Sequence, residues 1–311
     1  MCTNQVKSKS DSARNKTLLA VSAILALTVV AIFAVYLLAP KQPPQSKTGI
    51  VVAVTFYSLK PDLDQLVCSG DSVFSVTPSG VDPHEYQLTP SDVAKLRDAD
   101  IIVSTAHTPF ETQIRDLVSR GEIKAVLIEI PSIPGVSIKL NPATGQPNYH
   151  WPIYDPENYK IYMVYVEKKL ETLRPECAET YRSNLKNLIE KVSTIENATR
   201  KLNFCAVATS PPAQYAVEWA GIRVKYLLVK EEDLPATPED LARTESSLSS
   251  GECKLIVVVG STSTQVAQKA LELAARHSVP YIAIPDPIAP DSTLNKIFKV
   301  SQELTKLPPS G

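Results

Sequence analysis

One of the four histidines of this 311-residue chain, His84, lies in a turn that would suit a metal ligand. Pro83 precedes it, and Thr89-Pro90-Ser91 follows as the expected start of a helix. Proline fixes its own φ and restricts its neighbour, so a stiff loop presents His84, which loses little conformational freedom on coordinating an ion. Imidazole nitrogen is a common ligand of transition metals. The turn therefore makes His84 the first candidate ligand.

Two further side chains lie in comparable settings. His150 stands beside Trp151 in a loop that enters a helix, and Asp286 lies just past the last expected strand between two prolines. We expect both at the same sheet edge as His84. An alternative for Asp286 is that it only caps the helix that follows it.

The elements that would position these residues alternate between strand and helix. Short apolar runs are predicted as strands at residues 50–54, 72–76, 100–104 and 125–130, with helices around residues 63–67 and 91–99. After residue 202 the strands are expected at residues 205–208, 224–229, 255–259 and 281–284, with helices at residues 213–220, 238–249 and 264–277. Apolar runs separated by helical segments are typical of parallel sheets covered on both faces.

Residues 176–202 contain no proline or glycine and repeat apolar residues at the spacing of one helix face. We interpret them as a long bridging helix. The predicted fold class is α/β, with two parallel-sheet domains at residues 49–175 and 203–311 joined by that helix. Ligands of such sheets bind at the carboxyl ends of strands, here the crevice between the domains.

Residues 17–39 carry no charge and are long enough to cross a bilayer, whose hydrocarbon core is roughly 30 Å thick. We predict an uncleaved transmembrane helix, with a cleavable signal peptide as the alternative. The basic flank at residues 1–16 leaves this tail in the cytoplasm by the positive-inside rule. Residues 40–48 then form a linker to a domain on the extracytoplasmic face.

Composition excludes several classes of function. The formal net charge is −1, and residues 1–16 alone carry a net charge of +3, so the remainder carries −4 and a nucleic-acid partner is not expected. No Gly-x-Ser-x-Gly, His-Glu-x-x-His or phosphate-binding glycine loop is present, so we predict no enzyme. The five cysteines show no CxxC spacing. Two alternatives fit the cysteines: a Cys205–Cys253 disulfide, or buried free thiols.

Over about residues 49–306 the chain resembles the metal-binding solute-binding proteins of ABC importers, the zinc and manganese receptor family. The resemblance is carried by the turn at residues 82–86 with residues 89–93 behind it, by His150-Trp151 with Asp155-Pro156 after it, and by the long helix at residues 181–202. It implies two α/β domains bridged by a rigid helix, with one metal ion bound between them.

The resemblance also implies a ligand set. His84 and His150 match two ligands of the first domain, and Asp286 matches a carboxylate of the second. Where relatives place His or Glu directly after a threonine, this chain has Ser210, whose neutral hydroxyl is a poor ligand. Water held by Ser210, or His107 after the third strand, would complete the shell; alternatively His107 is an ordinary polar loop residue. A mixed nitrogen and oxygen site suits Zn²⁺, Mn²⁺ or Fe²⁺.

We therefore expect a membrane-anchored, monomeric receptor that captures a divalent transition metal (zinc or manganese, with iron as a further option) and delivers it to an ABC permease and its ATPase. The unbroken bridging helix favours modest domain rocking on capture. Binding is expected to fail as pH falls through the histidine range. Ser210 motivates the alternative, a divergent metal-free relative acting as a surface adhesion or other small-solute binding module. A metal-dependent enzyme ranks third.

Overall fold

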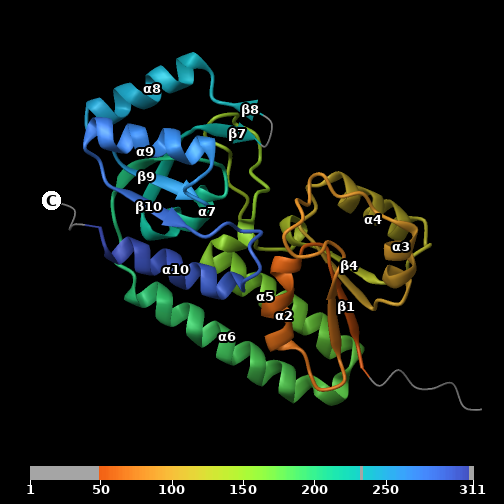
Figure 1. Cartoon of the computed structure of the whole chain (residues 1–311). Helices are drawn as coiled ribbons and strands as arrows, with labels where there is room; N and C mark the ends of the chain where they lie inside the picture. The colour runs from red at the N-terminus through yellow and green to blue at the C-terminus, as the bar shows by residue number, and fades with distance from the viewer. Residues whose placement is uncertain (1–48, 232–233, 308–311) are drawn as a thin grey trace, which may run out of the picture. The chain divides into compact units, whose positions relative to one another are not determined.

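The first half of the described chain forms a parallel sheet. The computed structural model describes residues 49–231 and 234–307, which belong to one compact unit. Four parallel strands lie in the order β2-β1-β3-β4 (Figure 1). Their bounds are Val51–Val54 for β1, Ser72–Ser75 for β2, Ile101–Ser104 for β3 and Val126–Glu129 for β4. Each coincides with a predicted apolar run, so the α/β prediction is confirmed for this half.

Helices follow three of these strands, namely α2 (Lys60–Leu66), α3 (Pro90–Arg97) and α4 (Pro109–Ser119). The last two begin alike: a threonine N-cap, a proline in the first turn and an acidic residue that completes a capping box. The loops that carry His84 and His107 therefore each end at a firmly capped helix. Helix α3 agrees with the prediction, whereas α4 was not among the predicted elements.

The second half repeats the architecture with another four parallel strands, in the order β10-β9-β5-β6. The strands are β5 (Phe204–Ala208), β6 (Ile222–Leu227), β9 (Cys253–Val259) and β10 (Tyr281–Ile284). The helices are α7 (Ala213–Val217), α8 (Pro238–Ser249), α9 (Gln265–His277) and α10 (Thr293–Thr305). All three predicted helices and all four predicted strands are present in this half, with ends shifted by a few residues.

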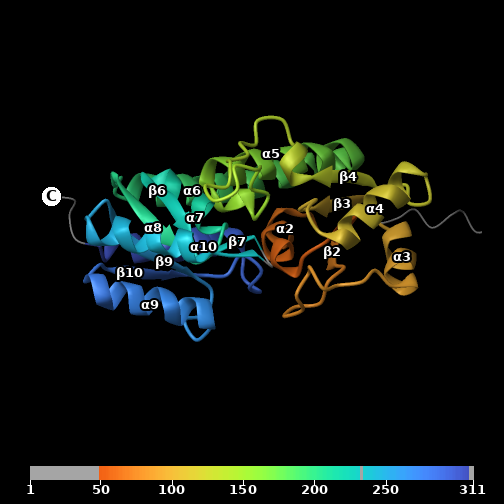
Figure 2. The same ribbon diagram turned by 90° about the horizontal axis from the view of Figure 1, so that it is seen from above.

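Successive residues of its central strands face different cores. Val207 and Val258 pack with α8 and α9, whereas Ala208 and Val257 join the larger core that includes α7 and α10. Successive strand side chains point to opposite faces, so a strand that is apolar throughout requires cover on both sides. Figure 2 shows α9 on one side of this sheet, and α7 and α10 pack on its other face.

The predicted bridging helix is present as α6 (Ala178–Ala198), preceded by α5 (Pro156–Leu173). Helix α6 packs on α5 and on both α2 of the first half and α10 of the second, so it spans the two halves (Figure 1). The larger hydrophobic core likewise draws on both sheets. The predicted domain boundaries around residues 176 and 202 stay predictions, since one continuous unit contains both sheets.

Smaller elements complete the described residues. The strands β7 (Val229–Glu231) and β8 (Leu234–Pro235) form an antiparallel pair that was not predicted. Short 3-10 helices lie at Tyr57–Leu59 (η1), Ile130–Ser132 (η2), Pro152–Tyr154 (η3), Pro175–Cys177 (η4) and Glu218–Ala220 (η5).

Two disulfides join distant parts of the chain. The predicted option Cys205–Cys253 links the neighbouring strands β5 and β9, with 4.5 Å between their Cα atoms. A second bridge, Cys68–Cys177, ties the end of α2 to the segment that starts α6 and was not predicted. Disulfides persist in oxidising compartments. Their presence agrees with a domain outside the cytoplasm.

Three predictions concern residues 1–48. The cytoplasmic tail at residues 1–16, the transmembrane helix at residues 17–39 and the linker at residues 40–48 all lie outside the described residues. Within residues 49–231 and 234–307, none of the helices combines the length and apolar character needed to span a bilayer.

Candidate metal centre

Every candidate ligand follows the carboxyl end of a parallel strand. His84 comes after β2, His107 after β3, His150 in the connection after β4, Ser210 after β5 and Asp286 after β10. All five line one cavity of about 200 Å³. The strands of each sheet end at a common edge, so residues spread over about two hundred positions meet at one place, where α/β sheets bind ligands.

Three imidazoles converge there. The ring centroids of His84 and His107 are 5.1 Å apart, and those of His107 and His150 are 5.4 Å apart. Two imidazoles on one tetrahedral ion, bonded at the usual 2.0–2.1 Å, have centroids roughly 5 Å apart. The rings meet edge to face, and among the described residues no group of three or more His, Cys, Asp or Glu side chains is arranged to hold an ion as it stands. Capture would therefore require the rings to rotate toward a common point.

A hydrogen-bond chain fixes the tautomer of His107. The Thr105 hydroxyl lies 3.0 Å from His107 Nδ1 and also lies 2.8 Å from Glu111 Oε2. The hydroxyl donates its single proton to the Glu111 carboxylate, so it accepts a hydrogen bond from His107 Nδ1–H. The lone pair of the ring is then on Nε2. A hydrogen bond to the ring nitrogen that does not bind the metal orients metal-binding histidines in this way.

His150 is oriented in the same way by Asn148. The Asn148 amide donates to Pro211 O at 3.1 Å and to Gln214 Oε1 at 3.0 Å, which leaves its oxygen as an acceptor 3.1 Å from His150 Nδ1. Nε2 of His150 is again the free ring nitrogen. Since Pro211 and Gln214 belong to the second half, the fully buried Asn148 also joins the two halves beside the site.

Both rings are neutral at physiological pH. Burial lowers the pKa of His107 to about 4; Glu111 opposes this shift and His84 adds to it. Burial likewise lowers the pKa of His150 to about 4, with further lowering from His107 and His84. Only neutral imidazole can ligate a metal. The site therefore keeps these two rings ready for coordination well below their ordinary titration range.

This shift predicts the pH dependence of the metal-free protein. Unfolded imidazoles take up protons below about pH 6.5, whereas these folded ones do so only near pH 4, so the unfolded state binds more protons in between. Stability should be complete above pH 6.5 and fall toward pH 4 by about 3 kcal/mol for each histidine, since one pKa unit corresponds to about 1.4 kcal/mol. Urea unfolding of wild type and of the His107→Asn/His150→Asn variant checks this. Parallel pH curves for the two proteins would contradict it.

Asp286 is held by both halves of the molecule. On either side of it, Pro285 O accepts from Tyr154 Oη at 2.8 Å and Pro287 O accepts from the buried Lys296 Nζ at 2.6 Å. Asp286 Oδ1 accepts from Ile288 N at 2.9 Å in a local turn. Helix α10 is capped by Ser292 instead, so the alternative that Asp286 only caps this helix is wrong.

Backbone strain gathers beside the histidines. Ala106, next to His107, has φ of +63°, and Trp151, next to His150, has φ of +59°. Left-handed conformations are unfavourable for residues with a β-carbon and persist only where surrounding structure enforces them. Trp151 is buried and stacks on Phe56, whose ring also contacts His107. Two of the three strained non-glycine residues in the described chain thus flank candidate ligands.

Glu231 is a site residue that sequence reasoning missed. It lines the same cavity, and its Oε2 lies 3.4 Å from His150 Nε2. Ser210 also lines the cavity but offers only a hydroxyl. A sequence signal existed, because three consecutive acidic residues at positions 231–233 follow a predicted strand end. Nothing in the sequence indicated which of them would face the histidines.

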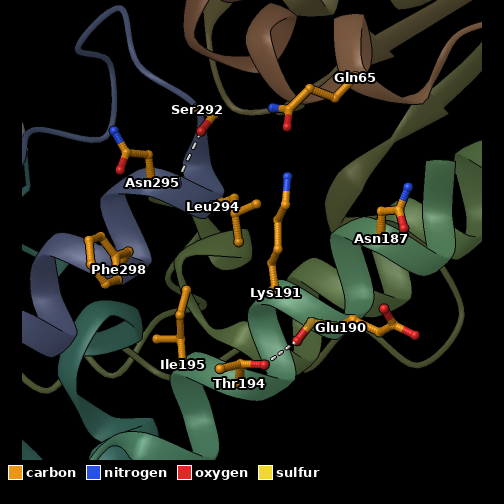
Figure 3. Close-up of a pocket in the computed structure, with 10 residues that line it drawn as sticks. All are labelled: Gln65, Asn187, Glu190, Lys191, Thr194, Ile195, Ser292, Leu294, Asn295 and Phe298. Atoms are coloured by element: carbon orange, nitrogen blue, oxygen red, sulfur yellow. Dashed lines mark hydrogen bonds between the residues drawn. The ribbon is translucent and has the colours of Figure 1, made fainter.

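A larger hollow of about 700 Å³ lies between α2, α6 and α10 (Figure 3). Lys191 of α6 extends into it toward Gln65 of α2, and Leu294 of α10 lies beside them. Glu190 is the only carboxylate of its lining, which contains no histidine or cysteine. This hollow therefore lacks the donors of a transition-metal site.

Sequence comparison relates this chain to a family of known proteins. The family model described as "Zinc-uptake complex component A periplasmic" matches residues 52–295. The metal ABC transporter substrate-binding lipoprotein ScbA of Streptococcus cristatus is 28% identical over 43% of this chain and 45% of its own length. The iron-binding protein YfeA of Yersinia pestis is 28% identical over 53% of this chain and 52% of its own length. The chain thus spans about half the length of these relatives.

Solved structures share the fold. The substrate-binding protein FpvC of Pseudomonas aeruginosa, solved with Mn²⁺, superposes with a TM-score of 0.67 over 83% of this chain and 99% of its own, at 15% identity. At that identity the likeness concerns the fold alone. It confirms the predicted architecture of two parallel-sheet halves.

Proposed function

We propose that this chain, which belongs to the family described as "Zinc-uptake complex component A periplasmic", captures a divalent transition metal ion and delivers it to an ABC permease. The observation that carries the proposal is the meeting of His84, His107 and His150 at one cavity, with Asp286 entering from the other half. His84, His150 and Asp286 are the proposed ligands, and His107 joins them.

The donor set explains what the site would take. Three imidazole nitrogens with carboxylate oxygens suit Zn²⁺, Mn²⁺ and Fe²⁺. The ion is cargo, so no group is needed to activate water or to transfer protons to a substrate. We infer that the chain is a receptor and not an enzyme.

The location and partners belong to the same proposal. The two disulfides favour an oxidising compartment, and the uncharged segment at residues 17–39 would anchor the domain at the outer face of the cell membrane. Tyr149, Leu234 and Ile288 expose apolar surface where they line the hollows beside the histidines. This rim would face the permease, with its ATPase on the far side of the membrane, and the receptor would act as a monomer.

Metal analysis of the full chain tests the proposal. Protein purified without chelator should contain close to one transition-metal ion per chain, and the stripped protein should bind Zn²⁺ or Mn²⁺ with one-to-one stoichiometry in calorimetry. Protein that neither carries nor binds these ions at neutral pH would favour the metal-free adhesion or small-solute alternative.

A further inference from the structure

The second half of the molecule supplies few donors where Ser210 lies. Asp286 is its one carboxylate among the sequence-predicted ligands, and the hydroxyl of Ser210 is neutral and short. Asp82 also lines the cavity, but it belongs to the first half, where its Oδ1 accepts from His84 N at 2.9 Å. A second acidic side chain from the second half would supply the charged oxygen donor that Ser210 lacks.

Glu231 meets this requirement through its position in the fold. It is the last residue of β7, which follows β6 at the same sheet edge that carries Ser210 and Asp286. Its side chain lines both hollows that contain the histidines. At 37% exposure it lies at the mouth of the site, within reach of an entering ion.

The carboxylate is also oriented. Asn141 is buried, and its Nδ2 donates to Glu231 Oε1 at 2.8 Å and to Lys230 O at 2.7 Å. One amide thus holds both the backbone of β7 and one carboxylate oxygen. The other oxygen, Oε2, is left facing His150 Nε2 at 3.4 Å, the nitrogen whose lone pair is free.

We propose that Glu231 is a ligand of the transported ion and supplies the second-half donor that Ser210 does not. This inference rests on the proposed function, metal capture by His84, His107, His150 and Asp286. In the metal-free protein Glu231 Oε2 lies against His150; on capture, the ion enters between these two groups and both bind it. The end of β7 therefore carries part of the binding site.

The proposal includes a preference among ions. Carboxylate oxygen is a harder donor than imidazole nitrogen, and Mn²⁺ depends more on hard oxygen ligands than Zn²⁺ does. Three imidazoles and Asp286 would still form a good Zn²⁺ site without Glu231. Removing this carboxylate should therefore weaken Mn²⁺ binding more than Zn²⁺ binding, which a general loss of folding would not do.

Glu231→Gln in the full chain tests the inference, with Mn²⁺ and Zn²⁺ affinities measured by competition against a chromophoric chelator. We expect the Kd for Mn²⁺ to rise roughly 100-fold, less than for the loss of an imidazole because Gln keeps a neutral oxygen donor, and the Kd for Zn²⁺ to rise less than about 10-fold. The Co²⁺-loaded variant should also show an altered visible absorption spectrum, since a ligand has changed.

One matched variant serves as the control. Glu239→Gln removes an equal charge from the exposed face of α8, outside the cavity. It should keep wild-type affinities and spectra. Unchanged Mn²⁺ binding in Glu231→Gln, or equal losses for both ions with a lowered melting temperature, would overturn the role of Glu231. A wild-type protein that binds neither ion would overturn the proposed function itself, and with it this inference.

Discussion

Replacing His84 or His150 with alanine is expected to lower the affinity for Zn²⁺ and Mn²⁺ by roughly 1000-fold, about 4 kcal/mol. Loss of a group that merely supports a ligand costs about 10- to 100-fold, and loss of the ligand itself should cost more. The two positions are not equivalent structurally. His150 is held by Asn148, whereas His84 is presented by a turn in which its own N–H donates to Asp82 Oδ1 at 2.9 Å.

Calorimetric titration of each variant with both ions measures this effect. His277→Ala is the matched control, because His277 lies at the end of α9 and lines neither hollow that contains the other histidines. It should bind as wild type does. His107→Ala should give an affinity between that of the control and those of the His84 and His150 variants, since the other two imidazoles and Asp286 would remain to hold the ion. Wild-type affinity in both His84→Ala and His150→Ala would refute the proposed metal site.

Much of the fold was predictable because local sequence determined it. Apolar runs such as Leu255–Val259 have one stable place in a protein of this kind, the interior of a doubly covered parallel sheet. The bridging helix was predictable because its apolar residues repeat at helical spacing without interruption. The hairpin of β7 and β8 was not, because its two short strands carry little local pattern.

The site was predictable in part for the same reason. Asp286 and His84 each follow a predicted strand, and His150 lies in a loop that enters a helix, so the sequence alone makes these three side chains candidate ligands. Glu231 is one of three consecutive acidic residues. Its hydrogen bond with Asn141, ninety positions away, orients it toward the site, and the sequence does not show this contact. The Cys68–Cys177 bridge spans 109 positions and likewise depends on tertiary packing.

A buried carboxylate, Asp62 of α2, connects the two halves of the molecule. It accepts hydrogen bonds from Thr293 N at 2.6 Å and Leu294 N at 3.3 Å, at the start of α10, and from Tyr159 Oη at 2.9 Å. Burial raises its pKa, and these hydrogen bonds act in the opposite direction. Asp62 thus satisfies amide groups that a buried helix N-terminus would otherwise leave without partners.

The same helix fixes the Asp286 loop through Lys296. Burial lowers the pKa of Lys296 to about 8, and Asp62, Asp286 and Asp291 oppose that shift. Its Nζ donates to Pro287 O and lies 5.6 Å from the centre of the Trp151 ring. Asp62 therefore bears on the metal centre in two ways: it anchors the start of α10 to the first half, and it offsets the charge of the lysine that holds the loop.

Asp62→Ala should accordingly lower the free energy of unfolding by about 4 kcal/mol, because it leaves two buried amide donors and the Tyr159 hydroxyl without an acceptor and Lys296 with less compensation. Asp62→Asn keeps one acceptor oxygen, so its free energy of unfolding should fall less. Tyr159→Phe removes a single donor and should be the least destabilised of the three variants. Urea unfolding of the metal-free proteins gives this order. Equal stability of Asp62→Ala and wild type would mean that packing of α6 alone holds α10 against the first half, and that the Asp286 loop does not depend on Asp62.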